Sequence, residues 1–146
     1  MKEQNTKRLL KRYPKIFKEY YKPMTETCMC WGFECGDGWY PLINSLCDSL
    51  QFDTDNNGFP QVVASQVKEK YGTLRFYYNI ESSEDEYYEN KCGSQEGKIR
   101  FAELLSGYTC ETCGSYDRVK QTKGWIVTLC HKCMEKYNEK RKNKSE

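Results

Sequence analysis

The sequence predicts an α+β fold in which helices surround a β-hairpin, followed by a small C-terminal module organised by four cysteines. Two Cys-x-x-Cys pairs lie sixteen residues apart near the C-terminus. Upstream, apolar and polar residues alternate on both sides of a Tyr71-Gly72 dipeptide, which is typical of a hairpin. Apolar residues at helical spacing occur before and after it. We therefore expect an α+β domain over 1–107 and a module over 108–146, packed together as one unit.

The composition indicates a small protein with few aliphatic residues to bury. Its 146 residues allow one domain, or one domain with a small module. Hydrophobic residues make up 38% and aromatic residues 14%, so aromatic rings must supply much of the buried area. No apolar run approaches the ~18 residues of a membrane span, and the lysine-rich start does not resemble a secretory signal. We expect a cytoplasmic protein without a membrane partner, whose nine cysteines are thiols or metal ligands.

Charge is distributed unevenly along the chain. Residues 1–23 carry eight Lys or Arg against two Glu, and residues 24–60 carry six acids and no Lys or Arg. Residues 121–146 again have seven Lys or Arg against three Glu. This pattern argues against a uniformly basic nucleic-acid-binding protein, but it allows a basic patch if the two termini fold onto the same side.

The N-terminal segment 3–21 predicts amphipathic helices. Pro14 interrupts the apolar face, so we expect two short helices with Pro14 near the start of the second. The lysines form the opposite, solvated face, with a basic binding arm as the alternative. The apolar positions at helical spacing are Leu9, Leu10, Tyr13, Ile16, Phe17 and Tyr20.

The next segment, 28–41, contains three glycines and two tryptophans, which predict an ordered, tightly turned loop. Acidic groups beside aromatic rings suit a cationic or ring-bearing partner, so Trp31, Glu34, Asp37 and Trp39 are candidate binding residues. Structural packing explains the tryptophans equally well.

Four cysteines in and after this loop offer a second candidate metal site. These are Cys28, Cys30, Cys35 and Cys47. Their Cys-x-Cys and wide spacings match no standard zinc knuckle, and free thiols are the alternative.

A helix is expected to begin at Pro41 and to run through Leu50. The stretch from Asp53 to Gly58 resembles the opening of a calcium-binding EF-hand loop. Ala64 stands where that motif needs a bidentate Glu, however, so the stretch predicts a turn.

Residues 61–80 predict the hairpin itself, turning at Tyr71-Gly72. The even-numbered apolar residues that follow the turn share one face. Arg75 and Tyr77 lie on the other face and form a candidate polar binding surface.

Two further segments connect the hairpin to the module. Residues 81–92 are acidic and predict a loop. Residues 97–106 carry apolar residues at helical spacing, and Gly107 predicts the end of that helix.

The strongest chemical signal is the pair of Cys-x-x-Cys motifs, Cys110/Cys113 and Cys130/Cys133. Each motif lets two thiolates reach one ion, and two motifs complete a tetrahedral shell with no position left for water or substrate. Such closed shells are structural Zn²⁺ sites. Gly114 can adopt the positive φ that the first turn needs. A redox or free-thiol cluster is the alternative.

The order of elements around these cysteines predicts a treble clef. Residues 117–129 predict a hairpin, and the second cysteine pair then lies at the start of a helix carrying Met134 and Tyr137. A helix N-terminus favours negatively charged thiolates. His131 lies between the two ligands and is expected to face solvent.

Several stretches of the chain resemble a group of small phage and prophage proteins of undetermined function, over about residues 24–133. The resemblance implies a phage or prophage origin and a bacterial cytoplasm, and it supplies no catalytic residue. The stretches are Trp31–Trp39, Val67–Tyr77, Gly97–Glu103, the Cys110 knuckle and Gly124–Cys130.

Three functions follow from these observations. The first is a zinc-stabilised accessory protein that binds a host protein or a small ligand through the loop 31–40, with counter-defence as one role. The second is a nucleic-acid-binding zinc protein that uses its basic termini. The third is a metal-dependent hydrolase using Glu34 and Asp37, although such acidic pairs are common and a binding protein is expected before an enzyme.

Overall fold

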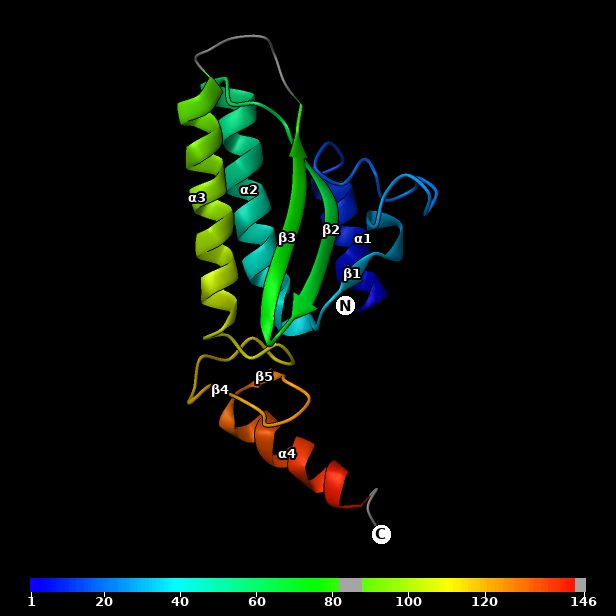
Figure 1. Ribbon diagram of the computed structural model, residues 1–146, viewed down its shortest axis with the longest axis vertical. Helices are drawn as coiled ribbons and strands as arrows, with labels where there is room; N and C mark the ends of the chain where they lie inside the picture. The colour runs from blue at the N-terminus through cyan, green and yellow to red at the C-terminus, as the bar shows by residue number, and fades with distance from the viewer. Residues whose placement is uncertain (82–87, 144–146) are drawn as a thin grey trace.

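The computed structural model describes residues 1–81 and 88–143 and has the expected α+β architecture. Figure 1 shows an elongated molecule: helices and a small sheet form one body, and the C-terminal module extends from one end of it. The helices are α1 (Glu3–Arg12), α2 (Tyr40–Asn57), α3 (Tyr88–Ser106) and α4 (His131–Lys142), with short 3₁₀ turns at Met29–Trp31 and Asp37–Trp39. The strands are β1 (Phe33–Glu34), β2 (Val62–Lys70), β3 (Thr73–Ile80), β4 (Lys120–Gln121) and β5 (Thr128–Leu129).

The body contains a three-stranded sheet in the order β1-β2-β3. Strands β2 and β3 form the expected antiparallel hairpin. Its turn residues, Tyr71 and Gly72, both have positive φ (53° and 76°), as a two-residue turn matching the twist of the strands requires. The sequence did not predict β1, which pairs in parallel with β2 and places Phe33 opposite Val67.

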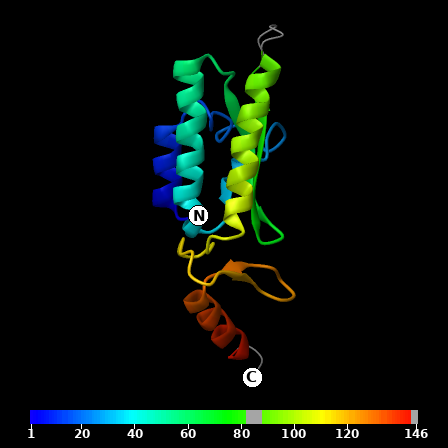
Figure 2. The same cartoon turned by 90° about the vertical axis from the view of Figure 1, so that its left-hand side faces the viewer.

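Helices cover one face of this sheet. Figure 2 shows α2 and α3 side by side in front of the hairpin, with α1 beside α2. The Tyr13 hydroxyl joins α1 to α2 by donating to the backbone oxygen of Asn44 (2.9 Å). Phe17 packs edge-on against Phe33 and Phe76, with ring centroids 4.9 and 6.5 Å apart. Five of the nineteen buried core residues described in the body are aromatic and most of the others are aliphatic, so aromatic rings supply a smaller part of the core than the composition predicts.

The second N-terminal helix is absent from the described residues. Residues 14–22 form successive turns, although Ile16 and Phe17 are buried as expected. The carbonyl of Ile16 accepts the amide of Ala64 (2.8 Å), beside a β-bulge between Ala64 and Gln66. This bond to the sheet takes the carbonyl that a helix would use internally.

Two predicted segment boundaries also change. Helix α2 continues past Leu50 to Asn57, so the expected turn after Asp53 is helical. Gly58 ends the helix in a left-handed conformation (φ 63°), and Asp53 is held by an ion pair with Lys98. Helix α3 starts earlier than predicted, at Tyr88, and ends at Ser106 before Gly107. The rest of the predicted acidic loop includes residues 82–87, which lie outside the described residues.

Candidate metal centre and its attachment to the body

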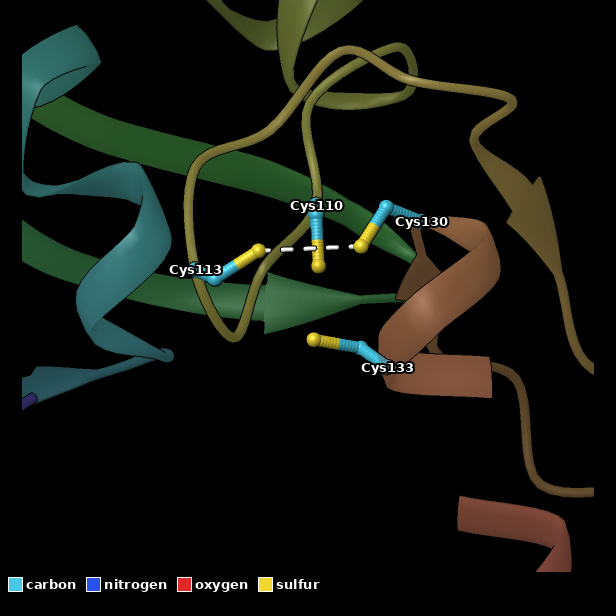
Figure 3. Close-up of side chains that lie close together, drawn as sticks. All are labelled: Cys110, Cys113, Cys130 and Cys133. Carbon is cyan, nitrogen blue, oxygen red and sulfur yellow. Dashed lines mark hydrogen bonds between the residues drawn. The ribbon is translucent and has the colours of Figure 1, made fainter. Parts of the chain in front are cut away.

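The four cysteines of the C-terminal motifs converge on one point. In Figure 3, the sulfur atoms of Cys110, Cys113, Cys130 and Cys133 point toward a common centre, and all lie within 4.8 Å of one another. The Sγ atoms of Cys113 and Cys130 are 3.6 Å apart, well beyond a disulfide bond. A tetrahedral ion with S ligands at ~2.3 Å would separate the sulfurs by ~3.8 Å. The residues present therefore fit a four-coordinate metal ion.

The chain positions these cysteines by local hydrogen bonds. The amide of Gly114 donates to the carbonyl of Cys110 (2.8 Å), and Gly114 has the expected positive φ of 77°. On the other side, Cys130 precedes helix α4, and its carbonyl accepts the amide of Met134 (2.9 Å). The backbone N–H of Cys133 lowers the pKa of the Cys130 thiol to about 7, against the opposing effect of burial.

The module has very little apolar core of its own. Its buried cluster consists of Cys110, Leu129 and Cys130. Partly buried side chains such as Met134 and Tyr137 pack against this cluster. No residue of α4 is buried, and His131 is exposed as expected. Two of the three buried residues belong to the four-cysteine cluster, so an ion bound there would be the main source of this module's stability.

The loop between β1 and α2 holds the first cysteine motif; we call residues 36–39 the Gly36–Trp39 seat. The amide of Gly38 donates to the carbonyl of Glu111 (2.8 Å), and the amide of Gly36 donates to the Glu111 carboxylate (2.9 Å). The indole N–H of the fully buried Trp39 donates to the carbonyl of Thr109 (2.9 Å). Burial raises the pKa of Glu111, although the hydrogen bond from Gly36 opposes this.

The two glycines of the seat permit this close approach. A Cβ at Gly38 would lie 2.1 Å from the carbonyl oxygen of Cys110 and 2.5 Å from the amide nitrogen of Gly114. A Cβ at Gly36 would lie 2.2 Å from the carbonyl oxygen of Glu111. Only glycine therefore allows the two backbones to meet here.

A second attachment lies at the tip of the β2–β3 hairpin. The Thr128 hydroxyl donates to the carbonyl of Gly72, and the Gln121 amide donates to the carbonyl of Tyr71 (3.4 Å). A Cβ at Gly72 would lie 2.6 Å from the Gln121 amide nitrogen. The module thus contacts the body through the seat and through the hairpin tip.

The predicted binding residues of the 31–40 loop have divergent environments. Trp39 is part of the seat, and Asp37 accepts hydrogen bonds from the Lys2 amide (2.8 Å) and the Asn5 side chain (2.9 Å). Burial acts to raise the pKa of Asp37, but these hydrogen bonds outweigh it and lower the pKa. Trp31 is 59% exposed, and Glu34 accepts a hydrogen bond from Gln66 (3.1 Å). Asp37 and Trp39 therefore serve structural contacts.

The other predicted binding pair lies on the open face of the hairpin. Tyr77 is 40% exposed, with the Lys68 ammonium 5.6 Å from its ring centroid. Arg75 is partly buried and lines a cleft between the body and the module.

The four front cysteines are not brought together as a metal site. Cys28 is exposed, and Cys30 donates from its sulfur to the carbonyl of Thr27 (3.2 Å). Burial raises the pKa of the Cys35 thiol to about 12 and raises that of Cys47 further. Within the described ranges, the C-terminal cysteines are the one group of three or more metal-ligating residues that the structure assembles.

No family model, curated protein or solved structure matches this chain. The resemblance to small phage proteins therefore stays a prediction. None of the helices in the described part of the chain has the length and apolar character needed to span a bilayer.

Proposed function

We propose that this chain is a zinc-stapled nucleic-acid-binding protein, whose C-terminal module presents a basic surface to the phosphate backbone. The proposal rests chiefly on the charge of that module. Residues 116–143 carry eight Lys or Arg against three Asp or Glu, whereas the rest of the chain carries fifteen against eighteen. Nucleic-acid affinity depends first on such concentrated positive charge.

Zinc is the metal we assign to the four-cysteine centre. Four thiolates in a tetrahedral arrangement are the preferred ligand set of structural Zn²⁺. A turn supplies Cys110 and Cys113, the β4–β5 hairpin follows, and Cys130 and Cys133 lie at the start of α4. This order of elements supports a treble clef. The ion would have a structural role, because the four thiolates leave no ligand position for water or substrate.

The exposed face of α4 carries the charge in a regular pattern. Lys132, Lys136 and Lys140 are four residues apart, so they lie on one face and span about 12 Å along the helix. Among the described residues, these three lysines form no ion pair. Several basic residues of the body are neutralised instead, as in the pairs Arg12–Asp48 and Lys15–Asp55.

A protein-binding role through the 31–40 loop is the second candidate. The 59% exposure of Trp31 favours it, because an ordered, exposed tryptophan is a common anchor at interfaces. Asp37 and Trp39, however, form hydrogen bonds with other parts of the chain. Trp31 is therefore the main side chain of this loop that remains available to a partner.

The proposed function predicts nucleic-acid binding that weakens steeply with salt. We expect the triple variant Lys132→Glu, Lys136→Glu, Lys140→Glu to bind oligonucleotides at least about tenfold more weakly. The slope of log affinity against log salt should fall in magnitude by about 2 to 3, because three phosphate contacts are lost. Fluorescence anisotropy with labelled single-stranded and duplex oligonucleotides measures both quantities.

The matched control reverses three exposed charges on α1: Lys7→Glu, Arg8→Glu and Lys11→Glu. This control has the same net charge as the test variant, so it separates a local surface on α4 from a general effect of net charge. Equal weakening by both variants, or binding that does not depend on salt, would contradict the proposal.

A further inference from the structure

A cleft of about 580 Å³ lies where the body meets the C-terminal module. Strand β3, the end of α3 and strand β4 all contribute to it, so segments distant in sequence converge there. Its volume falls within the range of small-ligand sites, about 300–1,000 Å³. We call it the Arg75 cleft. Its principal lining residues are Thr73, Arg75, Arg100, Leu104, Tyr108 and Gln121.

Arg75 is held in this cleft in a fixed orientation. Its Nη1 atom donates to the Thr73 hydroxyl (2.7 Å) and to the carbonyl of Leu74 (2.8 Å). A guanidinium has five N–H donors, so these bonds leave its Nε and Nη2 donors for a ligand. Within the described residues, no carboxylate forms an ion pair with Arg75. A partly buried arginine in this state is suited to bind a phosphate or carboxylate through two parallel hydrogen bonds.

The remaining charges of the cleft favour an anion. Arg100 lies at the rim, 75% exposed, and its nearest acidic partner is Glu96 at 3.9 Å. Of the described residues, Glu103 is the one carboxylate that lines the cleft, and its Oε1 accepts the amide of Phe76 (2.9 Å). The lining of the cleft therefore includes two guanidinium groups and one carboxylate, and that carboxylate already accepts a hydrogen bond from the sheet.

An aromatic and apolar wall stands beside these arginines. Leu104, in the last turn of α3, is 67% exposed, and Tyr108, in the turn that follows the helix, is 71% exposed. The amide of Tyr108 donates to the carbonyl of Leu105 (3.0 Å), and that of Gly107 donates to the carbonyl of Leu104 (3.1 Å). The Tyr108 ring is thus exposed on a backbone that is fixed by hydrogen bonds, as a stacking platform for a ring requires.

We propose that the Arg75 cleft binds one nucleotide, with its phosphate on Arg75 and its base against Tyr108. The inference deepens the proposed function and rests on it for the source of the ligand, which is a nucleotide within a bound strand. A free mononucleotide presents the same phosphate and ring. The guanidinium fork selects the phosphate, and the exposed ring selects the base over a simple anion.

The test compares free 5′-adenosine monophosphate with a short single-stranded oligonucleotide, using isothermal titration of the full zinc-loaded chain. We expect Arg75→Ala to weaken binding of the mononucleotide about tenfold or more and that of the oligonucleotide by a similar factor. Arg75→Lys should restore little, because an ammonium cannot form the paired hydrogen bonds. Tyr108→Ala should weaken both ligands severalfold, whereas Tyr108→Phe should not.

Control variants separate this proposal from the proposed function. Arg8→Ala removes an exposed charge from α1 and should change neither affinity. The triple α4 variant should bind the oligonucleotide at least about tenfold more weakly, while its affinity for the mononucleotide stays unchanged. Thermal unfolding of every variant identifies any effect of Arg75→Ala that comes from misfolding. In that case Arg75→Lys, which keeps the charge and much of the length of the side chain, replaces it as the deciding variant.

The outcomes are distinct. Oligonucleotide binding that needs α4, with neither probe sensitive to Arg75 or Tyr108, would overturn the cleft proposal and leave the proposed function standing. Mononucleotide binding that needs Arg75, without any oligonucleotide binding, would support the cleft and refute the proposed function. Inorganic phosphate that binds as tightly as the mononucleotide, with no effect of Tyr108→Ala, would overturn the assignment of a nucleotide.

Discussion

Removal of the metal, by a strong chelator or by Cys133→Ser, is expected to unfold residues 108–143 while the body stays folded. The module buries only Cys110, Leu129 and Cys130 in its own cluster, so it has little else to hold it together. Structural zinc contributes about 10–16 kcal/mol of apparent binding free energy in small zinc domains, far more than so small a core. Amide hydrogen exchange should show α4 losing its protection, and limited proteolysis should cleave first within the module.

Cys28→Ser is the control for this experiment. Cys28 is an exposed thiol far from the four-cysteine centre in sequence, so its loss should leave exchange and proteolysis unchanged. Protection of α4 that survives both chelation and Cys133→Ser would mean that the metal does not hold the module.

Gly38→Ala is expected to detach the module from the body and to lower the free energy of unfolding by about 3 kcal/mol or more. The added Cβ would meet two backbone atoms, the Cys110 oxygen at 2.1 Å and the Gly114 nitrogen at 2.5 Å. Backbone atoms next to a metal ligand cannot rotate aside as a flexible side chain can. Overpacking typically costs about 1–3 kcal/mol, and we expect the upper end or more here. Urea unfolding measures the change.

Gly97→Ala is the matched control for Gly38→Ala. Gly97 lies within α3, and a Cβ there would meet nothing within 4 Å. The same substitution should therefore stabilise the protein by about 0.5–1 kcal/mol, because alanine favours a helix over glycine. A Gly38→Ala variant that is as stable as wild type and binds zinc as tightly would contradict the role we give to the seat.

The features that sequence analysis predicted best depend on local spacing. Cys110 and Cys113 lie three residues apart, and a turn brings them together whatever the rest of the chain does. The Tyr71-Gly72 turn is similarly local, because its positive φ values follow from the demands of a two-residue hairpin. Both were predicted from a few neighbouring residues.

The seat could not be predicted, because it depends on contacts between segments far apart in the chain. Gly36 and Glu111 are separated by 75 residues. The sequence showed two glycines around Asp37 directly before a tryptophan, and a tight turn explained them adequately. Their second role, which is to let another backbone approach, appears only when the module is in place. The sequence therefore predicted a ligand-binding loop at residues 31–40, and the structure shows that residues 36–39 of this loop hold the C-terminal module.

The length of α2 illustrates a related limit. Residues 53–57 contain mostly short polar side chains, which favour turns and caps over helix interiors. Contacts outside the segment, such as the Lys98–Asp53 ion pair, keep it helical until Gly58. Tertiary contacts thus override the local preference of residues 53–57 for a turn.

The most direct test of the central claim, that one structural zinc ion in the four-cysteine centre keeps the module folded, is the zinc content per chain. Native mass spectrometry and elemental analysis of the purified protein measure it. We expect one zinc in the wild type and in Cys30→Ser, and none in Cys133→Ser. Two zinc ions per chain, a different metal, or zinc that persists in Cys133→Ser but is lost in Cys30→Ser would contradict the account.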